Sequence, residues 1–289
     1  MTSKKKHRPQ LLSSTRPRTL KPLPSTSSRK TRDTIRAHHT LRKQLSTALA
    51  NGDHAGAEEL RVQIENDGGL RKYQQASIQG QSAQRGGDTS KVLMEWLSDA
   101  MQPRSENMKR SRKLRLLEVG ALRSDNACSR SLVFDVERID LNSQHPDIKE
   151  QDFMGRSMPS TADRHNAGFD LVSLSLVVNF VGNPTERGEM LRRVETFLRP
   201  SEDELSQVFP ALFLVLPSAC VANSRYLDED RLEAIMQSLG YRKVKKKLSA
   251  KLVYYLWKHE KVVNEQSKPF KKEEVRTGTS RNNFAIVLL

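Results

Sequence analysis

Large apolar side chains are scarce at the start of the chain, and a helical spacing of apolar positions follows. Residues 1–33 consist mainly of Lys, Arg, Ser, Thr and Pro, a composition that cannot offset the entropy cost of ordering the backbone. We therefore predict a disordered basic tail over residues 1–33. From residue 34 apolar side chains recur near the helical period, so a small helical region is predicted over residues 34–104. Its last helix, 90–101, has Thr89 or Ser90 as the expected N-cap.

At about residue 114 the pattern changes to short apolar runs that alternate with helical stretches. The predicted strands are 114–119, 133–141, 169–178 and 211–216, with a possible short strand before Asp152, and the helices are 185–198 and 228–239. Continuous apolar strands separated by helices indicate a parallel sheet covered on both faces. The last apolar runs, 251–257 and 283–289, have no helical stretch between them and are expected to pair as an antiparallel hairpin. Residues 105–289 are thus predicted to form one α/β domain.

The net charge of +15 is concentrated near the two ends of the chain. Residues 1–43 carry a net +12 and residues 242–272 a net +9, whereas residues 44–241 sum to −6. A slightly acidic body with basic ends indicates a polyanionic partner that is approached by particular surfaces. Nucleic acid is the first expectation and an anionic membrane surface the second.

Membrane insertion and a disulfide framework are not expected. The longest apolar runs have the length of a strand, far below the ~20 residues that span a bilayer. Arg and Pro stand where the apolar segment of a signal peptide would be. The only cysteines, Cys128 and Cys220, are too far apart for a zinc motif, and the adjacent His38 and His39 point about 100° apart on a helix, so no metal site is expected.

The end of the first predicted strand is the expected cofactor site. In an open α/β sheet the ligand binds outside the carboxyl ends of the strands, where this chain has Glu118 and Gly120. Asp140 follows twenty residues after Gly120, the spacing of a carboxylate that holds a ribose. A turn glycine and a surface aspartate would give the same pattern. No G-x-G-x-x-G or G-x-x-x-x-G-K-[ST] motif is present, which weakens NAD and ATP and favours S-adenosylmethionine, which carries no phosphate.

Two further pairs are candidate contacts. Asp152 is placed to accept a hydrogen bond from the adenine amino group of the cofactor while Phe153 packs on the ring; a helix cap is the alternative. Asn179 and Phe180 follow the strongly apolar strand, where methyltransferases present groups to the acceptor. Phe180 would stack on a target base and Asn179 would read its edge, unless Phe180 belongs to the core. The lysines of residues 243–251 line either the substrate path or a solvated strand edge.

Together these segments resemble the fungal family that methylates adenine N1 in large-subunit (25S) ribosomal RNA. The resemblance rests on Gly69–Ser77, Arg85–Lys91, Leu117–Leu122, Arg138–Asn142, Gln151–Met154 and Phe169–Val181. It implies a Rossmann-like class I fold with a seven-stranded, mostly parallel sheet and an antiparallel C-terminal strand. It also implies S-adenosylmethionine as methyl donor, Gly120 and Asp140 as cofactor contacts, and a nuclear, nucleolar location. Leu122 and Ser124 stand where methyltransferases usually have small residues, and Arg85, Gly86 and Gly87 are candidates to complete the cradle.

The expected activity is therefore transfer of a methyl group to adenine N1 of large-subunit ribosomal RNA by a monomer that needs no metal. Neutral N1 carries an available lone pair, so positioning matters more than a general base. Asn179 and Phe180 are the expected catalytic residues. Animal relatives of the family bind the same cofactor as sensors, so a cofactor-binding regulator without turnover is the alternative function.

Overall fold

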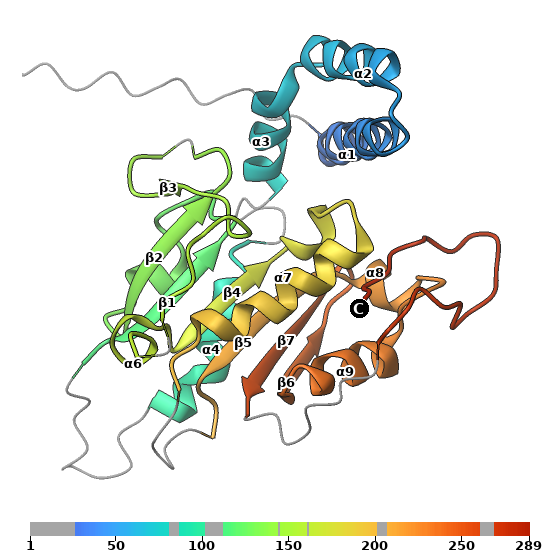
Figure 1. The fold of residues 1–289 in the computed structure, drawn as a ribbon. Coiled ribbons are helices and arrows are strands. Elements are labelled where there is room, and N and C mark those ends of the chain that lie inside the picture. The colour runs from blue at the N-terminus through green and yellow to red at the C-terminus, as the bar shows by residue number, and fades with distance from the viewer. Residues whose placement is uncertain are drawn as a thin grey trace, which may run out of the picture.

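The computed structural model describes residues 27–80, 87–101, 112–143, 145–160, 162–200, 207–260 and 269–289. Seven strands form one sheet in the order β3-β2-β1-β4-β5-β7-β6 (Figure 1). Their bounds are β1 Leu114–Val119, β2 Phe134–Asp140, β3 Lys149–Glu150, β4 Leu171–Ser175, β5 Ala211–Pro217, β6 Tyr241–Leu248 and β7 Leu252–His259. β7 is antiparallel to both of its neighbours and the other pairings are parallel, so the expected class I methyltransferase fold is confirmed.

Helices cover both faces of the sheet and extend beyond its upper edge. Those that follow the strands are α5 Ala127–Arg130, α6 Arg164–Ala167, α7 Pro184–Phe197, α8 Ser218–Ala222 and α9 Glu229–Ser238, with a 3-10 turn, η1, at Val178–Phe180. Those that precede the sheet are α1 Ser28–Ala50, α2 His54–Asn66, α3 Gly69–Gly80 and α4 Ser90–Met101. Among the residues that the structure describes, no helix is both long and apolar enough to cross a membrane.

Alternation along β5 divides the core between the two faces. Leu212, Leu214 and Leu216 pack with side chains of α7 and α9 on one face. Ala211, Phe213 and Val215 point to the other face, where they belong to the same core cluster as Leu93 and Leu97 of α4. Successive side chains of a strand point to opposite faces, so an entirely apolar strand fits a sheet that is covered on both sides. α4, which the sequence grouped with the helical region, is thus part of the core of the sheet domain.

The C-terminal hairpin was assigned wrongly from the sequence. β7 pairs with β6, and residues 283–289 form no strand of this sheet. Instead, the last residues run beside the first turn of α7, where the Val287 N–H donates to the carbonyl of Pro184 at 3.0 Å. β6 is the edge strand of the sheet and carries the lysines, which keep an exposed edge from pairing with other chains. An edge strand needs few apolar residues, and therefore β6 gave no apolar signal.

The start of α1 and the capping residue of α4 differ from the prediction, whereas the bounds of α4 are as predicted. α1 begins at Ser28 instead of residue 34, since the hydroxyl of Ser27 accepts a hydrogen bond from the Lys30 N–H at 3.2 Å. At α4 the Asp88 carboxylate, not Thr89 or Ser90, accepts from the first helical N–H, that of Ser90, at 2.9 Å. Residues 1–26, most of the predicted tail, lie outside the described residues.

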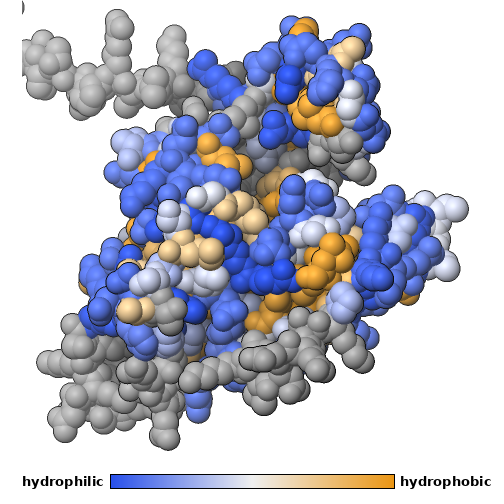
Figure 2. Space-filling view, in the orientation of Figure 1, coloured by the Kyte–Doolittle hydropathy of each residue, from blue (hydrophilic) through white to orange (hydrophobic). Residues whose placement is uncertain are grey.

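The first three helices form a small unit with its own core. Leu41 and Leu45 of α1 pack against Ala57 and Ile64 of α2. The unit lies above the carboxyl ends of β1, β2 and β4, with α3 nearest to the sheet (Figure 1). Figure 2 shows that hydrophilic residues cover most of its visible surface. The α1–α3 unit therefore stands at the edge of the sheet where the cofactor site was expected.

We predict that Asp170→Ala destabilises the fold by about 2 to 3 kcal/mol, because it removes a buried carboxylate that accepts from the Arg112 guanidinium and leaves the Arg115 N–H without its acceptor. Asp170 is 6% exposed and accepts two hydrogen bonds from Arg112, each at 2.8 Å, and one from the Arg115 N–H at 2.7 Å. Urea denaturation measures the loss. The control is Asp125→Ala, which breaks the exposed pair with Arg123 and is expected to cost less than about 1 kcal/mol. Equal losses in the two variants would contradict the prediction.

Candidate active site

The predicted site residues come together at the carboxyl ends of four adjacent strands. Gly120 follows β1, Asp140 ends β2, Asp152 follows β3, and Asn179 and Phe180 lie in η1 after β4. β1 stands between β2 and β4, because Val119 is in register with Ile139 on one side and Leu174 on the other. Candidates for cofactor binding and for substrate binding thus flank the same loop.

Gly120 is required by its backbone conformation and by a close neighbour. Its φ is +72°, in the left-handed region, and a Cβ at this position would lie 2.7 Å from a methyl group of Val177. Leu176 also has a positive φ, +59°, which is strained for a branched side chain. The chain therefore turns sharply after β4, brings Val177 against the β1 loop, and places η1 beside it.

A cavity of about 140 Å³ lies at this point, lined by Glu118 and Gly120 together with residues that the sequence analysis did not assign. Thr89 enters from the segment before α4, Lys91 from the first turn of α4, Asn126 from the loop after β1, and Ser175 from the end of β4. Asp140, Asp152, Asn179 and Phe180 are not among its lining residues. The cavity therefore covers only the part of the expected site nearest to β1.

Asp88 holds the segment before α4 against the loop after β1. One of its carboxylate oxygens accepts a hydrogen bond from the Ala127 N–H at 2.6 Å, and the other accepts from the Ser90 N–H and hydroxyl. The Thr89 hydroxyl is 2.8 Å from that of Ser175, which joins the same segment to β4. Arg85, Gly86 and Gly87 were the candidates from the sequence to complete the cofactor cradle. Arg85 and Gly86 lie outside the described residues, and Gly87 directly precedes Asp88.

Glu118 is the most perturbed carboxyl group of the site. Its side chain is 17% exposed, and burial raises its pKa to about 7, although a hydrogen bond from Asn126 and the charge of Arg138 oppose the shift. Oε1 accepts from the Asn126 side chain at 2.7 Å, whereas Oε2 is buried and has no hydrogen-bond partner among the described residues. A buried acceptor without a partner indicates that a donor is missing from this position.

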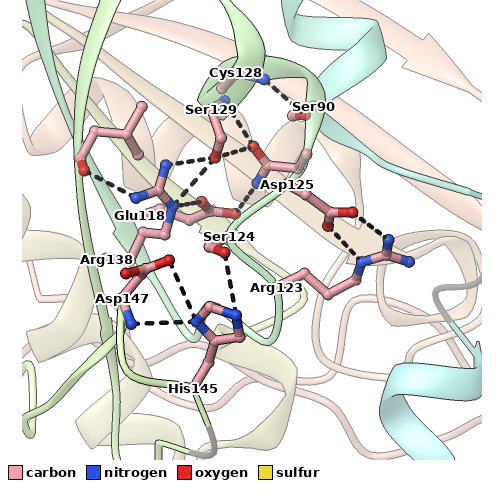
Figure 3. Close-up of polar contacts among 12 residues, drawn as sticks. Ser90, Glu118, Arg123, Ser124, Asp125, Cys128, Ser129, Arg138, His145 and Asp147 are labelled. Atoms are coloured by element: carbon pink, nitrogen blue, oxygen red, sulfur yellow. Dashed lines mark hydrogen bonds and ion pairs between the residues drawn. The ribbon is translucent and has the colours of Figure 1, made fainter. Parts of the chain in front are cut away.

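Arg138 is held beside Glu118 without fully neutralising it. Arg138 reaches from β2 and donates to the Ser129 hydroxyl at 2.6 and 3.1 Å, and its Nε is 4.0 Å from Glu118 Oε2 (Figure 3). Asn126 accepts from the Ser129 N–H and hydroxyl and at the same time donates to Glu118. The hydrogen bonds of this group are thus directed to one another, and one oxygen of Glu118 remains for a ligand.

The other two carboxylates of the expected cofactor site, Asp140 and Asp152, differ in their surroundings. Asp140 is half-buried, and burial raises its pKa, opposed by a hydrogen bond from the Asn142 N–H. Asp152 is exposed and accepts from the Met154 N–H at 2.8 Å. Phe153, in contrast, is 3% exposed and packs on Phe197 with a centroid distance of 5.3 Å. The expectation that the ring of Phe153 packs on adenine is therefore corrected: this ring fills the core between β3 and α7.

Asn179 and Phe180 face different surroundings within one turn. Asn179 Oδ1 is buried and has no hydrogen-bond partner among the described residues, the second such acceptor at this edge of the sheet. Phe180 is 37% exposed, so it is not a core residue, and its ring contacts Tyr73 of α3 edge-to-face at 5.9 Å. The structure thus brings a residue of the α1–α3 unit to the predicted catalytic position.

The remaining candidates are the two cysteines and the adjacent histidines. Both cysteines are buried, which raises the pKa of each thiol to about 12, so Cys128 and Cys220 stay protonated at neutral pH. Within the described ranges, no three His, Cys, Asp or Glu side chains are grouped so that they could hold a metal ion. His38 stacks on Tyr73, and the side chain of His39 lies outside the described part of the structure.

Comparison with known proteins identifies the family. A family model described as Bmt2, 25S rRNA (adenine(2142)-N(1))-methyltransferase, matches residues 58–286. A "25S rRNA adenine-N(1) methyltransferase" of Schizosaccharomyces pombe is 39% identical over 256 residues, which cover 87% of this chain and 89% of the relative. The chain belongs to this family of adenine-N1 methyltransferases.

Two further similarities differ in strength. The "25S rRNA (adenine(2142)-N(1))-methyltransferase" of Saccharomyces cerevisiae is 40% identical over 227 residues, which are 78% of this methyltransferase but 62% of the relative. The solved structure of an O-methyltransferase family protein from Burkholderia thailandensis has a TM-score of 0.38 and 11% identity, and the alignment covers 78% of this chain and 71% of that one.

Asp88, Asn126 and Arg138 are the functional residues that sequence reasoning missed. Asp88 belongs to the Arg-Gly-Gly-Asp segment that carries part of the family resemblance, so its polar side chain beside two glycines was the available signal. Asn126 gave no signal of its own, because its role depends on the folding of the β1 loop over Glu118. In the methyltransferase these residues set the ionisation of Glu118 and the position of the wall before α4.

We predict that Glu118→Gln stabilises the methyltransferase at high pH and has little effect at low pH. The folded-state pKa of about 7 lies above the ordinary value of 4.5, so the folded state takes up a proton between these pH values. Above pH 7 the buried carboxylate costs about 3 kcal/mol, and this penalty disappears as the pH falls towards 4.5. Urea denaturation of the cofactor-free protein between pH 5 and 8 measures the difference. A gain that does not depend on pH would contradict the assignment.

Proposed function

We propose that the methyltransferase transfers a methyl group from S-adenosylmethionine to N1 of one adenine, at the position that the family description numbers 2142. The observation that supports a cofactor site beside a base site is a pair of buried acceptors without partners among the described residues. They are Glu118 Oε2 and Asn179 Oδ1, at neighbouring strand ends. One lies in the wall of the cavity after β1 and the other in the turn after β4. Two ligands, a cofactor and a base, would supply the missing donors.

The residues after β1, β2 and β3 fit S-adenosylmethionine. The free oxygen of Glu118 suits the α-ammonium group, Asp140 the two ribose hydroxyls, and Asp152 the adenine amino group. Gly120 lets the β1 loop turn at the cavity wall, because its φ of +72° and the close approach of Val177 leave no place for a Cβ. When bound, S-adenosylmethionine supplies a methyl group on a cationic sulfur, which is ready for displacement. When ionised, Glu118 and Asp140 would add negative charge at the ends of β1 and β2, which favours binding of a cation.

The residues of η1 suit the target base. Asn179 Oδ1 is an acceptor for the exocyclic amino group of adenine, and Phe180 is an exposed ring on which a base can stack. Because N1 takes part in Watson–Crick pairing, the base must be unpaired or extruded before it reaches Phe180. N1 attacks with its own lone pair, so Asn179 and Phe180 contribute orientation and no proton transfer.

Turnover distinguishes this proposal from a cofactor sensor. The buried acceptor of Asn179 and the exposed ring of Phe180 favour an enzyme, because a protein that only binds S-adenosylmethionine needs no binding site for a base. Incubation with labelled cofactor and unmodified 25S ribosomal RNA tests the difference, with Gly120→Arg as the control that prevents cofactor binding. Incorporation at a single adenine supports the enzyme; cofactor binding without incorporation supports the sensor.

A nucleolar location and a monomeric state complete the proposal. Ribosomal RNA is assembled in the nucleolus, and the basic cluster Lys4–Arg8 has the composition of a nuclear address. Fluorescence of the tagged protein in cells, with and without residues 1–26, tests the location. Light scattering of the purified chain tests the monomer.

We predict that removal of either side chain that contacts the target base, Asn179 or Phe180, lowers kcat/KM by about 10- to 100-fold and leaves the cofactor affinity unchanged. This is the effect expected for the loss of one stacking or edge contact. The variants are Asn179→Leu, which removes the acceptor, and Phe180→Ala, which removes the ring. Asn179→Asp and Phe180→Trp keep an acceptor and a ring, and are expected to retain much more activity. Methylation at the rate of the unaltered enzyme in Asn179→Leu and Phe180→Ala would exclude both residues from the base site.

We predict that the affinity for S-adenosylmethionine rises as the pH increases from 5.5 to 7.5. Ionisation of Glu118, whose pKa is about 7, creates the carboxylate that attracts the ammonium group, and that group remains protonated over most of this range. Calorimetric titration at several pH values measures the dependence. In Glu118→Gln the affinity is expected to be low and independent of pH; a dependence retained in this variant would assign the titration to another group.

A further inference from the structure

Basic charge is unevenly distributed over the α1–α3 unit. α1 carries six Lys and Arg residues and one acidic residue, Asp33, and α3 carries Arg71 and Lys72 and no acidic residue. Between them, residues 53–67 hold five acidic side chains and one Arg. α1 packs against both α2 and α3. The unit therefore combines two basic helices with one acidic helix.

Several basic side chains of α1 and α3 have no acidic partner. Arg36, Arg42, Arg71 and Lys72 are exposed and form no ion pair within the described part of the chain. Arg29 lies 4.0 Å from Asp33, an exposed and weak pair. These side chains keep their charge available for a polyanion.

The lysines of β6 are in a different situation. Lys243 pairs with Glu229 and Glu233 at 3.3 and 2.6 Å, Lys246 pairs with Glu229 at 3.0 Å, and Lys247 pairs with Glu95 of α4 at 3.0 Å. Much of the charge on this strand is thus balanced by α9 and α4. The sequence had suggested residues 243–251 as the segment that guides RNA, and these ion pairs favour the strand-edge alternative instead.

A line of rings connects the basic helices to the base site. His38 of α1 stacks on Tyr73 of α3 with a centroid distance of 4.6 Å and an interplanar angle of 18°. Tyr73 in turn contacts Phe180 edge-to-face at 5.9 Å and 82°. Burial and the nearby charge of Arg42 lower the pKa of His38, so this ring is neutral at physiological pH. Tyr73 directly follows Arg71 and Lys72 in the same turn of α3.

We propose that α1 and α3 bind the phosphate backbone of the ribosomal RNA strand that flanks the target adenine. The proposal rests on the function proposed above and extends it to a docking surface, formed by Arg36, Arg42, Arg71 and Lys72. These side chains neutralise phosphates without reading sequence. The acidic residues of 53–67 repel the same strand, so the RNA runs along α1 and α3 and reaches Phe180 past Tyr73.

Charge reversal tests the docking surface on the full-length chain. The variant Arg36→Glu/Arg71→Glu/Lys72→Glu is compared with Lys113→Glu/Lys245→Glu/Lys251→Glu, which changes the net charge by the same amount at exposed sites outside the α1–α3 unit. Binding of an unmodified 25S ribosomal RNA fragment is measured at several salt concentrations. The variant with charge reversals in α1 and α3 is expected to lose at least 10-fold in RNA affinity. The slope of the logarithm of its binding constant against the logarithm of the salt concentration is expected to decrease in magnitude by about 2. The control is expected to lose less than about 3-fold.

The outcomes are separable from those of the proposed function. Unchanged RNA affinity in the Arg36→Glu/Arg71→Glu/Lys72→Glu variant, or an equal loss of affinity in the control, overturns the docking surface. Unchanged RNA affinity would assign these basic residues to an acidic protein instead. Cofactor affinity and thermal unfolding are expected to match the unaltered protein in both variants. If the unaltered protein binds RNA on this surface but does not methylate it, the function fails while the docking surface stands.

Tyr73 provides a second readout of the same path. Tyr73→Ala is expected to lower kcat by more than 5-fold with less than a 2-fold change in RNA affinity, because the ring positions Phe180 and does not bind phosphate. Tyr73→Phe keeps the ring and is expected to restore kcat. Unchanged kcat in Tyr73→Ala would show that the strand reaches Phe180 without this contact.

Discussion

The close approach of the β1 loop to the segment after β4 determines the arrangement of the site. Gly120 and Val177 meet at a distance that no Cβ would allow, and this contact depends on the positive φ of Leu176. The same turn starts η1 and so places Asn179 and Phe180 beside the cofactor loop. A longer or relaxed turn after β4 would separate the two halves of the site. The local strain at Leu176 is thus retained where the two binding regions must touch.

The site also keeps polar groups in a state that is unfavourable for folding alone. Glu118 is buried with one oxygen unpaired and its pKa raised to about 7, and Asn179 keeps an unpaired carbonyl oxygen. Unpaired buried acceptors cost free energy in the absence of a ligand. Asn126, Ser129 and Arg138 hold Glu118 in place but leave that oxygen unpaired. Hydrogen-bond donors of a bound ligand would pair with these acceptors and so offset part of this cost.

The division between sheet and helices separates chemistry from recognition. The sheet domain supplies the carboxylates, Gly120 and the η1 turn, and the α1–α3 unit stands above these strand ends (Figure 1). This unit carries the exposed Arg36, Arg42, Arg71 and Lys72, which have no acidic partner among the described residues. Tyr73 connects the two, because its ring touches Phe180. The ion pairs of β6 show why a count of lysines alone does not locate a binding surface: the same residue type is free on one element and balanced on another.

The sequence by itself determined the strands β1, β4 and β5, the helices α7 and α9, and the place of Gly120, Asp140, Asn179 and Phe180 at strand ends, because these follow from apolar period and order along the chain. Only the tertiary structure decided that β6 pairs with β7, that Phe153 is a core residue, and that Asp88 and Asn126 surround Glu118. These facts depend on contacts between residues distant in the sequence, and on burial, which changes the ionisation of a carboxyl group. The apolar pattern predicts which face of an element is covered, and packing alone decides which polar side chain lies against it.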